Sequence, residues 1–277
     1  REDHAGIGVQ LMRDAEGALR VLPDPDGPAA RAGVPNGARL LAIDGHPVQD
    51  LGPASVAALA AGAPRAALEL LVDTPQGGPR SMSVPRSRRT GPVVRLQFPQ
   101  GRRAIRIFAF TPDTRQELEY HLLSASTKAS ACIIDLRGCA GGDLLSAVDC
   151  AMLFLPRGTV LGSLNRPKAR EVWHCSRGLA PFDGALVLWQ DEGTASAAEV
   201  LLSALVDNQR AISVGRRTFG KGSVQELIPL PDGAALVLTT GEARGPHGRV
   251  IEGRGLDPQR PVPGAGFGGF GRAVAAP

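Results

Sequence analysis

Two segments of the chain have the same organisation. In each, an apolar run is followed by a turn of small residues and then by a helical stretch. In the first, ACIIDLRG (131–138) is followed by CAGG and by DLLSAVDCAMLFL (143–155). In the second, ALVLW (185–189) is followed by QDEG and by TASAAEVLLSALVDN (194–208). Continuous apolar runs of this length are typical of strands buried on both faces of a sheet. The sequence therefore predicts a mixed α/β fold, in which helices pack on a layered sheet.

The composition restricts the classes of protein that fit the chain. Hydrophobic residues make up 43% of the 277 and aromatic residues 4%, which predicts aliphatic cores. The net charge is +4 and the arginine pairs are scattered without aromatic neighbours, so we expect a solvated basic surface and no nucleic-acid site. The longest apolar run, AVDCAMLFL (147–155), is too short to span a bilayer. The opening REDHAGIGV lacks a secretory leader, as in a cytosolic, mature or trimmed form.

The cysteines indicate neither a metal site nor a particular redox compartment. They form no CxxC pair and have no histidine at zinc-ligand spacing, so we expect no metal and no cofactor. Four cysteines could form two disulfides, whereas Cys132 and Cys150 lie in apolar contexts where buried free thiols are commoner. The four positions are Cys132, Cys139, Cys150 and Cys175.

The first 86 residues follow a different pattern, of short strands separated by glycine and proline turns. Pro28 is expected at the start of a short helix and Gly33 at its end. The polar segment SRRTGP (87–92) separates this part from the α/β pattern, and the Gly/Pro-rich residues 263–277 form a tail. The expected elements of the first part are strands over 6–14, 18–24, 39–45, 66–74 and 80–86 and a helix over 54–62.

This first part resembles a PDZ domain. GIGV (6–9) matches the loop before the peptide-binding strand, and GPAARAGVPNGARLLAIDG (27–45) matches the family's "sPA..AGl..GD.I..IdG". One departure is Ala38-Arg39, where an acidic residue is usual. Such a domain adds a peptide as an extra strand and holds its carboxylate on backbone N–H groups. The resemblance implies that this loop consists of Gly6, Ile7, Gly8 and Val9.

Two turns in the second part could support chemistry. DLRGCAGGDLL (135–145) places glycines at a helix start, where free N–H groups can hold an anion, although many such turns are glycine-rich for steric reasons. WQDEGTASAAEVL (189–201) places Ser196 in the first turn of a helix. The alternative is that Thr194 or Ser196 only caps this helix. Side chains expected to fix these turns and the helix packing are Asp135, Arg137 and Glu199.

A lysine between two glycines is unusual in this chain. Only three of the 31 basic residues are lysines, and Lys221 lies in RTFGKGSVQ (217–225). A guanidinium keeps its proton in proteins, whereas a buried lysine can lose it and act as a base. A loop lysine without a function is the alternative reading.

The two turns and Lys221 together resemble the C-terminal processing peptidases, also called tail-specific proteases. GTASAAE and TFGKGSVQ match their "GSASASE" and "FGKGSVQ", with Lys221 25 positions after Ser196. DLRGCAGG matches "DLRnNPGG", AIRIFAF (104–110) matches "YIrI.sF", and residues 231–258 match "l.dGsalklTta.y.tP.Gr.I.g.GI.PD". The similarity runs from Gly6 to about Pro261.

The resemblance implies a Ser–Lys mechanism. Ser196 would attack a peptide carbonyl, and a neutral Lys221, desolvated in its cleft, would take the serine proton and pass it to the leaving amine. Gln225 matches a residue that orients the lysine, with an ordinary strand residue as the alternative. The implied oxyanion hole consists of backbone N–H groups, from Ala197 and from Gly141 or Gly142.

The resemblance also implies the organisation and function of the whole chain. It implies a PDZ domain (1–86), a hinge (87–92), a crotonase-like layered α/β catalytic domain (93–262) and a tail (263–277). The implied function is that of a serine endopeptidase that recognises protein C-termini through its PDZ domain and cleaves near them, without a cofactor, in the periplasm or another extracytoplasmic compartment. Its partners would be proteins or peptides with exposed C-termini, and we expect no nucleic acid and no integral membrane segment.

Two other functions fit parts of the sequence. One is a catalytically degenerate scaffold that binds C-terminal tails, against which the retained Ser196, Lys221 and Gln225 argue. The other is a crotonase-like acyl-CoA enzyme, which would explain neither the PDZ domain nor FGKG. A Ser-His-Asp triad lacks support because the histidines lie in no nucleophile or base motif and GxSxG is absent. Cys139-Ala140 replaces the family's Asn-Pro, which predicts a looser glycine turn.

Overall fold

The computed structural model divides into two compact units, Arg1–Gly91 and Pro92–Pro277. Of the expected hinge over 87–92 only Ser87 is described, and the expected tail over 263–277 lies outside the described residues, so both boundaries stay predictions. The described residues are 6–13, 17–24, 27–49, 51, 56, 59–60, 65–74, 77–87, 93–99, 102–124, 131–176, 182–229 and 235–262.

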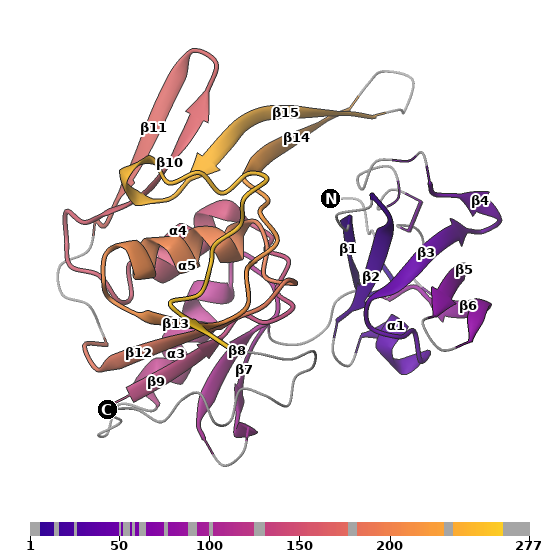
Figure 1. Ribbon diagram of the computed structural model, residues 1–277, viewed down its shortest axis with the longest axis horizontal. Coiled ribbons are helices and arrows are strands. Elements are labelled where there is room, and N and C mark those ends of the chain that lie inside the picture. The colour runs from indigo at the N-terminus through magenta and orange to yellow at the C-terminus, as the bar shows by residue number, and fades with distance from the viewer. Residues whose placement is uncertain are drawn as a thin grey trace. The chain divides into compact units, whose positions relative to one another are not determined.

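The described part of the first unit contains a small antiparallel sheet and the short helix α1. It contains β1 (Val9–Arg13), β2 (Leu19–Pro23), α1 (Pro28–Arg31), β3 (Ala38–Ile43), β4 (His46–Pro47), β5 (Ala67–Thr74) and β6 (Gly78–Pro85). The strand order is β1-β2-β3-β5-β6, with β4 paired to β3, so β1 lies at an edge (Figure 1). The expected strands are confirmed, whereas β4 was not predicted.

The local sequence explains these elements. Pro28 begins α1, where its fixed φ suits the first helical turn, and Gly33 follows the helix with φ 79°. Along β5, Leu68, Leu70 and Val72 are buried, and the residues between them are exposed or half-buried, as a sheet with one buried face requires. Of the helix expected over 54–62, three residues are described, all of them helical: Val56, Leu59 and Ala60.

The described residues of the second unit form two sheets and three α-helices. In chain order it contains β7 (Val94–Gln97), β8 (Ala104–Ile107), α3 (Thr114–Leu123), β9 (Ala131–Asp135), α4 (Leu144–Ala151), β10 (Val160–Arg166), β11 (Ala169–His174), β12 (Ala185–Gln190), α5 (Ala197–Asp207), β13 (Ile212–Gly215), β14 (Ser223–Pro229), β15 (Ala235–Arg244), the 3-10 helix η2 (Pro246–Gly248) and β16 (Arg260–Pro261). The larger sheet has the order β16-β13-β12-β9-β8-β7 and is parallel except for β7. The smaller, antiparallel sheet has the order β11-β10-β15-β14.

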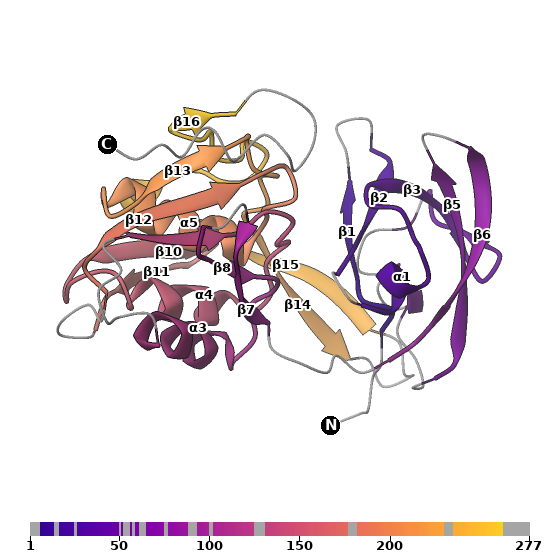
Figure 2. The ribbon, with the colours of Figure 1, turned by 90° about the horizontal axis from the view of Figure 1, so that it is seen from below.

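Helix α5 lies between the two sheets of this unit. α4 packs on α5, and α5 contacts β13 of the larger sheet and β10 of the smaller one (Figures 1 and 2). The residues of α5 from Ala197 to Leu205 are all buried, as expected of a helix covered on every side. The predicted mixed α/β class and its layers are therefore confirmed.

α4 is shorter than the helix expected over 143–155. It begins as predicted, with Asp143 as the N-cap residue, whose side chain accepts a hydrogen bond from Ser146 N. After Ala151 the chain tightens, because the N–H groups of Leu153 and Phe154 bond three residues back instead of four.

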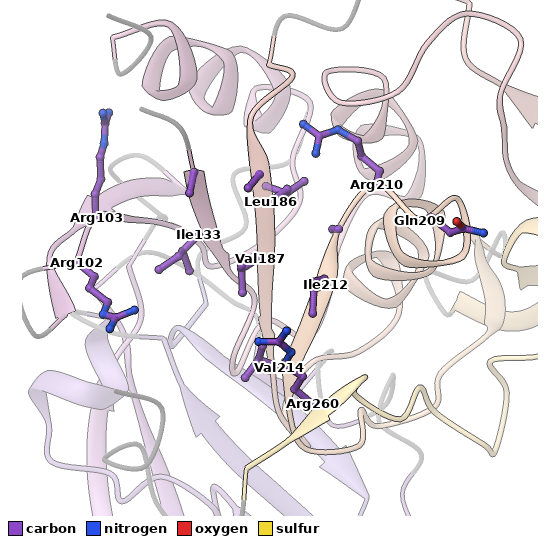
Figure 3. A pocket seen from close by; sticks show the side chains of 13 residues that line it. Arg102, Arg103, Ile133, Leu186, Val187, Gln209, Arg210, Ile212, Val214 and Arg260 are labelled. Atoms are coloured by element: carbon purple, nitrogen blue, oxygen red, sulfur yellow. The ribbon is translucent and has the colours of Figure 1, made fainter. Parts of the chain in front are cut away.

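The face of the larger sheet away from the helices carries a second, smaller apolar cluster. Its buried members are Ala104, Ile133, Trp189, Val214 and Val262. A cavity of about 530 Å³ opens here, with Ile133, Val187 and Val214 on its floor and arginines, among them Arg102 and Arg260, at its rim (Figure 3). It lies near the first residues of β9, β12 and β13, at the edge opposite to the turns that follow β9 and β12.

Candidate active site

Ser196 lies in the turn between β12 and α5, at the N-cap position of α5. Its backbone angles are φ 57° and ψ −122°, whereas an ordinary N-cap residue is extended. A residue other than glycine in such a region costs about 1–3 kcal/mol and persists only where its surroundings hold it. The position of Ser196 fits a capping role, but capping does not account for its positive φ.

The glycine turn after β9 packs directly on the Ser196 turn. Gly141 has φ 100°, and a Cβ there would come within 2.8 Å of Ser196 Cβ and of Ala197 N. Gly142 has φ 134°, and a Cβ there would come within 2.2 Å of Phe110 O. Within the described residues, the N–H groups of Gly141, Gly142 and Ala197 have no hydrogen-bond acceptor. The donors predicted for an oxyanion hole are thus brought together beside Ser196 and are unused.

Cys139-Ala140, in place of the family's Asn-Pro, is held by backbone hydrogen bonds. Cys139 N donates to Leu136 O at 3.0 Å, and Cys139 O accepts from Ala195 N at 2.9 Å. The Cys139 side chain is fully buried. These contacts fix the turn without a proline, and the looser geometry expected from the sequence stays a prediction.

The Glu199 carboxylate joins the Ser196 turn to the lysine loop. Its Oε2 accepts from Ser196 N at 2.9 Å and from Lys221 N at 2.8 Å. Its Oε1 accepts from Gly220 N at 2.8 Å and from Thr218 Oγ1 at 2.5 Å. Burial raises the pKa of Glu199, and these four donors act in the opposite direction. The sequence-based expectation that Glu199 fixes this turn by hydrogen bonds is confirmed.

The glycines beside Lys221 are required by close backbone contacts. A Cβ at Gly220, which has φ 92°, would lie 2.7 Å from Gly255 N, and one at Gly222 would lie 2.9 Å from Glu252 N. Glu252 Oε2 accepts from Gly222 N and from Ser223 N, both at 2.6 Å. The carboxylates of Glu199 and Glu252 therefore accept hydrogen bonds from four consecutive backbone N–H groups. These bonds fix the backbone on both sides of Lys221.

The side chains of Lys221 and Gln225 are exposed. The expectation that Lys221 is desolvated in its cleft is therefore wrong for this structure, because the loop that carries it lies at the surface of the unit. Gln225 lies on β14 beside a register shift between Val224 and Gln225. Among the described residues no hydrogen bond links Lys221 Nζ to Ser196 Oγ or to Gln225, so the structure fixes the backbones of these residues and not a contact between their side chains.

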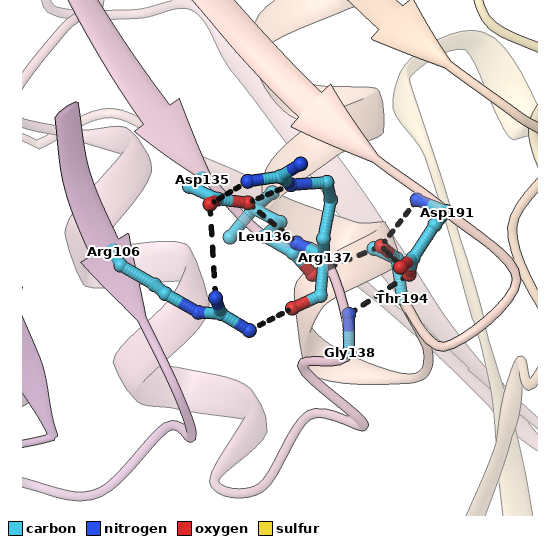
Figure 4. A network of polar contacts seen from close by, with 7 residues as sticks. All are labelled: Arg106, Asp135, Leu136, Arg137, Gly138, Asp191 and Thr194. Atoms are coloured by element: carbon cyan, nitrogen blue, oxygen red, sulfur yellow. Dashed lines mark hydrogen bonds and ion pairs between the residues drawn. The ribbon is translucent and has the colours of Figure 1, made fainter. Parts of the chain in front are cut away.

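A second polar network holds the start of the glycine turn (Figure 4). The Asp135 carboxylate accepts hydrogen bonds from Arg137 Nε at 2.8 Å and from Arg137 Nη2 at 2.6 Å. The two side chains form a bidentate ion pair that is almost fully buried. Arg106 Nη2 donates to Arg137 O at 3.0 Å. The Arg137 guanidinium also lies 4.6 Å from the ring centre of Trp189. The predicted role of Asp135 and Arg137 in fixing this turn is confirmed.

The loop expected to hold a peptide carboxylate precedes β1. Gly8 has φ 65°, and a Cβ there would lie 2.8 Å from Pro28 Cδ. Ile7 O accepts from Ala29 N at 2.9 Å, which ties the loop to α1. Within the described part of the chain, the N–H groups of Ile7 and Gly8 have no acceptor. The loop that includes Gly6 and Val9 thus presents open donors beside the edge strand β1.

Among the described residues, no group of three or more His, Cys, Asp or Glu side chains is placed to hold a metal ion. None of the four cysteines, all of which lie among the described residues, forms a disulfide, and Cys139, Cys150 and Cys175 are buried. No described helix has both the length and the apolar character needed to cross a membrane.

Both units of the chain are similar to known protein families. The Peptidase family S41 model matches residues 104–262, and a PDZ domain model matches residues 21–74. The carboxyl-terminal-processing protease of Synechocystis is 32% identical over an alignment of 267 residues, which covers 93% of this chain and 62% of that protein. Carboxyl-terminal-processing peptidase 1, chloroplastic, of Arabidopsis thaliana is 31% identical and covers 92% of this chain and 55% of its own length.

A solved structure has a similar fold. The photosystem II D1 C-terminal processing protease superposes with a TM-score of 0.81 at 25% identity, over 95% of this chain and 73% of that one. The fold thus places the chain in the class of PDZ-containing S41 proteins. The chain belongs to peptidase family S41, among the carboxyl-terminal-processing proteases. It spans less than two thirds of the length of these curated relatives.

Three side chains that hold the site together were not predicted from the sequence. They are Asp191, which accepts from Gly138 N, Thr218, which donates to Glu199, and Glu252, which accepts from the lysine loop. Asp191 directly follows a buried strand and could have been noted as a charged residue at a strand end. Nothing in the local sequence signals that Thr218 bonds to Glu199 or that Glu252 bonds to the lysine loop.

Proposed function

We propose that the protein is a serine endopeptidase in which Ser196 is the nucleophile and Lys221 the general base. The observation that carries the proposal is the backbone of Ser196, with φ 57° and ψ −122° in a turn from strand to helix. A sharp, strained turn of this kind holds a serine hydroxyl clear of its own helix in other hydrolases. Strain at one residue is consistent with a functional constraint there.

In the proposed mechanism, neutral Lys221 takes the proton from Ser196 Oγ as the oxygen attacks a peptide carbonyl carbon. The N–H groups of Ala197 and of Gly141 or Gly142 stabilise the negative charge on the carbonyl oxygen. The lysine then gives its proton to the leaving amine, and a water activated by the same lysine hydrolyses the acyl-enzyme. A bound peptide that covers the exposed Lys221 would supply the desolvation that favours the neutral amine.

A serine-reactive probe tests the nucleophile. The wild-type protein, incubated with a fluorophosphonate and digested, should carry the phosphonyl group on the peptide that contains Ser196, as measured by mass spectrometry. Ser196→Ala should remain unlabelled, and Ser203→Ala, which alters a buried serine of α5, serves as the control that should label like wild type. Labelling of Ser196→Ala at the wild-type rate would refute the assignment.

For the first unit we propose that it recognises the C-terminus of the substrate. The open N–H groups of Ile7 and Gly8 and the edge position of β1 support a carboxylate held on the loop and a peptide strand added to β1. Amidating the C-terminus of a peptide substrate should raise KM without changing kcat, because only binding is affected. An unchanged KM would refute this recognition.

A catalytically degenerate scaffold that binds C-terminal tails is the second candidate. The exposed Lys221, without a hydrogen bond to Ser196 among the described residues, favours it. Such a scaffold would bind C-terminal peptides, leave them intact and fail to react with the fluorophosphonate.

We also propose an extracytoplasmic location, which rests on the family resemblance. Relatives in Arabidopsis thaliana and Tetradesmus obliquus are named as chloroplastic, so related proteins work in a separate compartment. In fractionated cells the protein should follow extracytoplasmic markers, and recovery with cytosolic markers would contradict the proposal.

A further inference from the structure

The Asp191 carboxylate lies between the two turns of the candidate active site (Figure 4). It directly follows β12, and its side chain is buried. Its Oδ1 accepts from Gly138 N at 2.8 Å, in the glycine turn, and from Gly193 N at 2.9 Å, in the Ser196 turn. One oxygen atom therefore ties together two turns that are 53 residues apart in the chain.

Thr194 makes the second side-chain link between the same turns. Its hydroxyl donates to Leu136 O at 2.9 Å and accepts from Asp191 N at 3.0 Å. Beyond these two side chains, a backbone bond from Ala195 N to Cys139 O, at 2.9 Å, completes the contact. Because Ala195 directly precedes Ser196, a shift at any of these links moves the serine relative to the glycine turn.

The backbones of the two turns are also in close contact at this point. A Cβ at Gly193 would lie 2.8 Å from Gly138 Cα and 3.2 Å from Asp191 Oδ1. A side chain at Gly193 would separate the turns, and the carboxylate fills the remaining space with an acceptor for both N–H groups. The close contact of the two turns thus depends on a glycine at position 193 and on the Asp191 carboxylate.

The proposed oxyanion donors belong to different turns, since Ala197 follows Ser196 whereas Gly141 and Gly142 follow β9. Two donors stabilise a developing charge only if their separation matches one oxygen atom, and a displacement of about 1 Å can cost up to about a hundredfold in rate. Among the described residues no hydrogen bond links these donors to Asp191, so we expect the carboxylate to act by setting the distance between the turns.

We propose that Asp191 is a positioning residue that, with Thr194, sets the separation of the two halves of the oxyanion hole. The inference rests on the proposed function, because it assumes that the two turns together form an oxyanion hole. It predicts that changes at Asp191 affect the rate of the chemical step and not the binding of the peptide.

Three variants and a control test this role. Asp191→Ala removes the shared acceptor and should lower kcat about 10–100-fold with KM within about twofold of wild type. Asp191→Asn keeps an oxygen in place and should retain kcat within about threefold. Thr194→Val, which leaves Asp191 intact, should also lower kcat. Asp207→Ala, at the far end of α5, removes an ion pair with Arg249 and should lower the melting temperature while kcat is unchanged.

The rate of fluorophosphonate labelling of Ser196 gives a readout that does not depend on substrate binding. It should fall in Asp191→Ala and Thr194→Val in parallel with kcat, measured well below each melting temperature, and recover in Asp191→Asn. The inference is overturned if Asp191→Ala and Thr194→Val keep the wild-type kcat and labelling rate, or if Asp191→Asn is as slow as Asp191→Ala.

Failure of the proposed function has a different outcome. If wild-type protein cleaves no substrate and Ser196 is not labelled, the proposed function and this inference both fail. If wild type is active and Ser196→Ala inactive while both Asp191→Ala and Thr194→Val are fully active, only the positioning role fails.

Discussion

The backbone N–H groups of Ser196 and Lys221 donate to the same atom, Oε2 of Glu199. The two residues are 25 positions apart in the sequence and belong to a helix start and a loop before β14. One buried carboxylate therefore holds the backbones of both residues proposed for the chemistry. Among the described residues no hydrogen bond joins their side chains.

Glu199→Gln should disrupt this junction although the change is small in volume. A glutamine can accept at only one end, so its amide nitrogen would face two of the four donors. Leaving these donors unpaired in a buried site should lower the free energy of unfolding by about 2–4 kcal/mol and abolish cleavage. Urea unfolding and a peptide-cleavage assay measure the two effects. A variant with wild-type stability and rate would show that the carboxylate does not hold the site.

Ser196→Gly should make the protein more stable and inactive. Glycine adopts positive φ without the penalty that a serine has at φ 57° and ψ −122°, so we expect a gain of about 1 kcal/mol in the free energy of unfolding. Ser203→Gly, inside α5, is the matched control and should lose about 1 kcal/mol, since glycine disfavours a regular helix. Equal losses in both variants would contradict the strain assigned to Ser196.

Lys221→Arg should be as inactive as Lys221→Ala. Arginine keeps a positive charge at this position but cannot accept the serine proton. The control is Lys168→Arg, which changes an exposed lysine between β10 and β11 and should retain wild-type kcat. Near-normal cleavage by Lys221→Arg would rule out a lysine base.

The stability of the protein should depend on pH through Asp191. Burial raises the pKa of Asp191 from its ordinary 3.8, and the charges of Glu192 and Asp135 raise it further, while the N–H groups of Gly138 and Gly193 lower it. Protonation of Asp191 therefore contributes its full stabilisation of the fold at pH values below the ordinary pKa. This contribution is lost as the pH rises through the raised pKa of the folded state.

Asparagine at position 191 does not titrate, which isolates this effect. The free energy of unfolding of Asp191→Asn, relative to wild type, should increase as the pH rises from about 4 and then level off above the raised pKa. Urea unfolding at a series of pH values from about 4 to 8 gives the difference. A difference that stays constant over this range would contradict the raised pKa.

Much of the fold follows from local sequence patterns. The buried strands β9 and β12, the turns after them and the helices α4 and α5 were predicted because apolar runs and small-residue turns are local signals. β4 and β16 were not predicted, since each has two residues and exists only through pairing with a neighbouring strand. The early end of α4 depends on three-residue hydrogen bonds that its apolar sequence does not signal.

The candidate site was predictable to a similar extent. Ser196, Lys221 and the glycine turn follow from motifs, and Glu199 from its place three residues after Ser196. Glu252 and Asp191 act through contacts 30 and 53 residues away, which only the folded chain brings together. The exposure of Lys221 was predicted wrongly because burial of a loop depends on neighbouring segments and on bound substrate, neither of which a short motif encodes.

Above all, we propose that Ser196 cleaves peptide bonds near the C-termini of other proteins. Mass spectrometry of an intrinsically disordered protein, incubated with wild type and with Ser196→Ala at equal concentration, tests it most directly. Wild type should produce fragments that lack C-terminal residues, with the cut sites close to that end, and Ser196→Ala should leave the substrate at full length. The same fragments from both proteins, or an intact substrate with both, would contradict the claim.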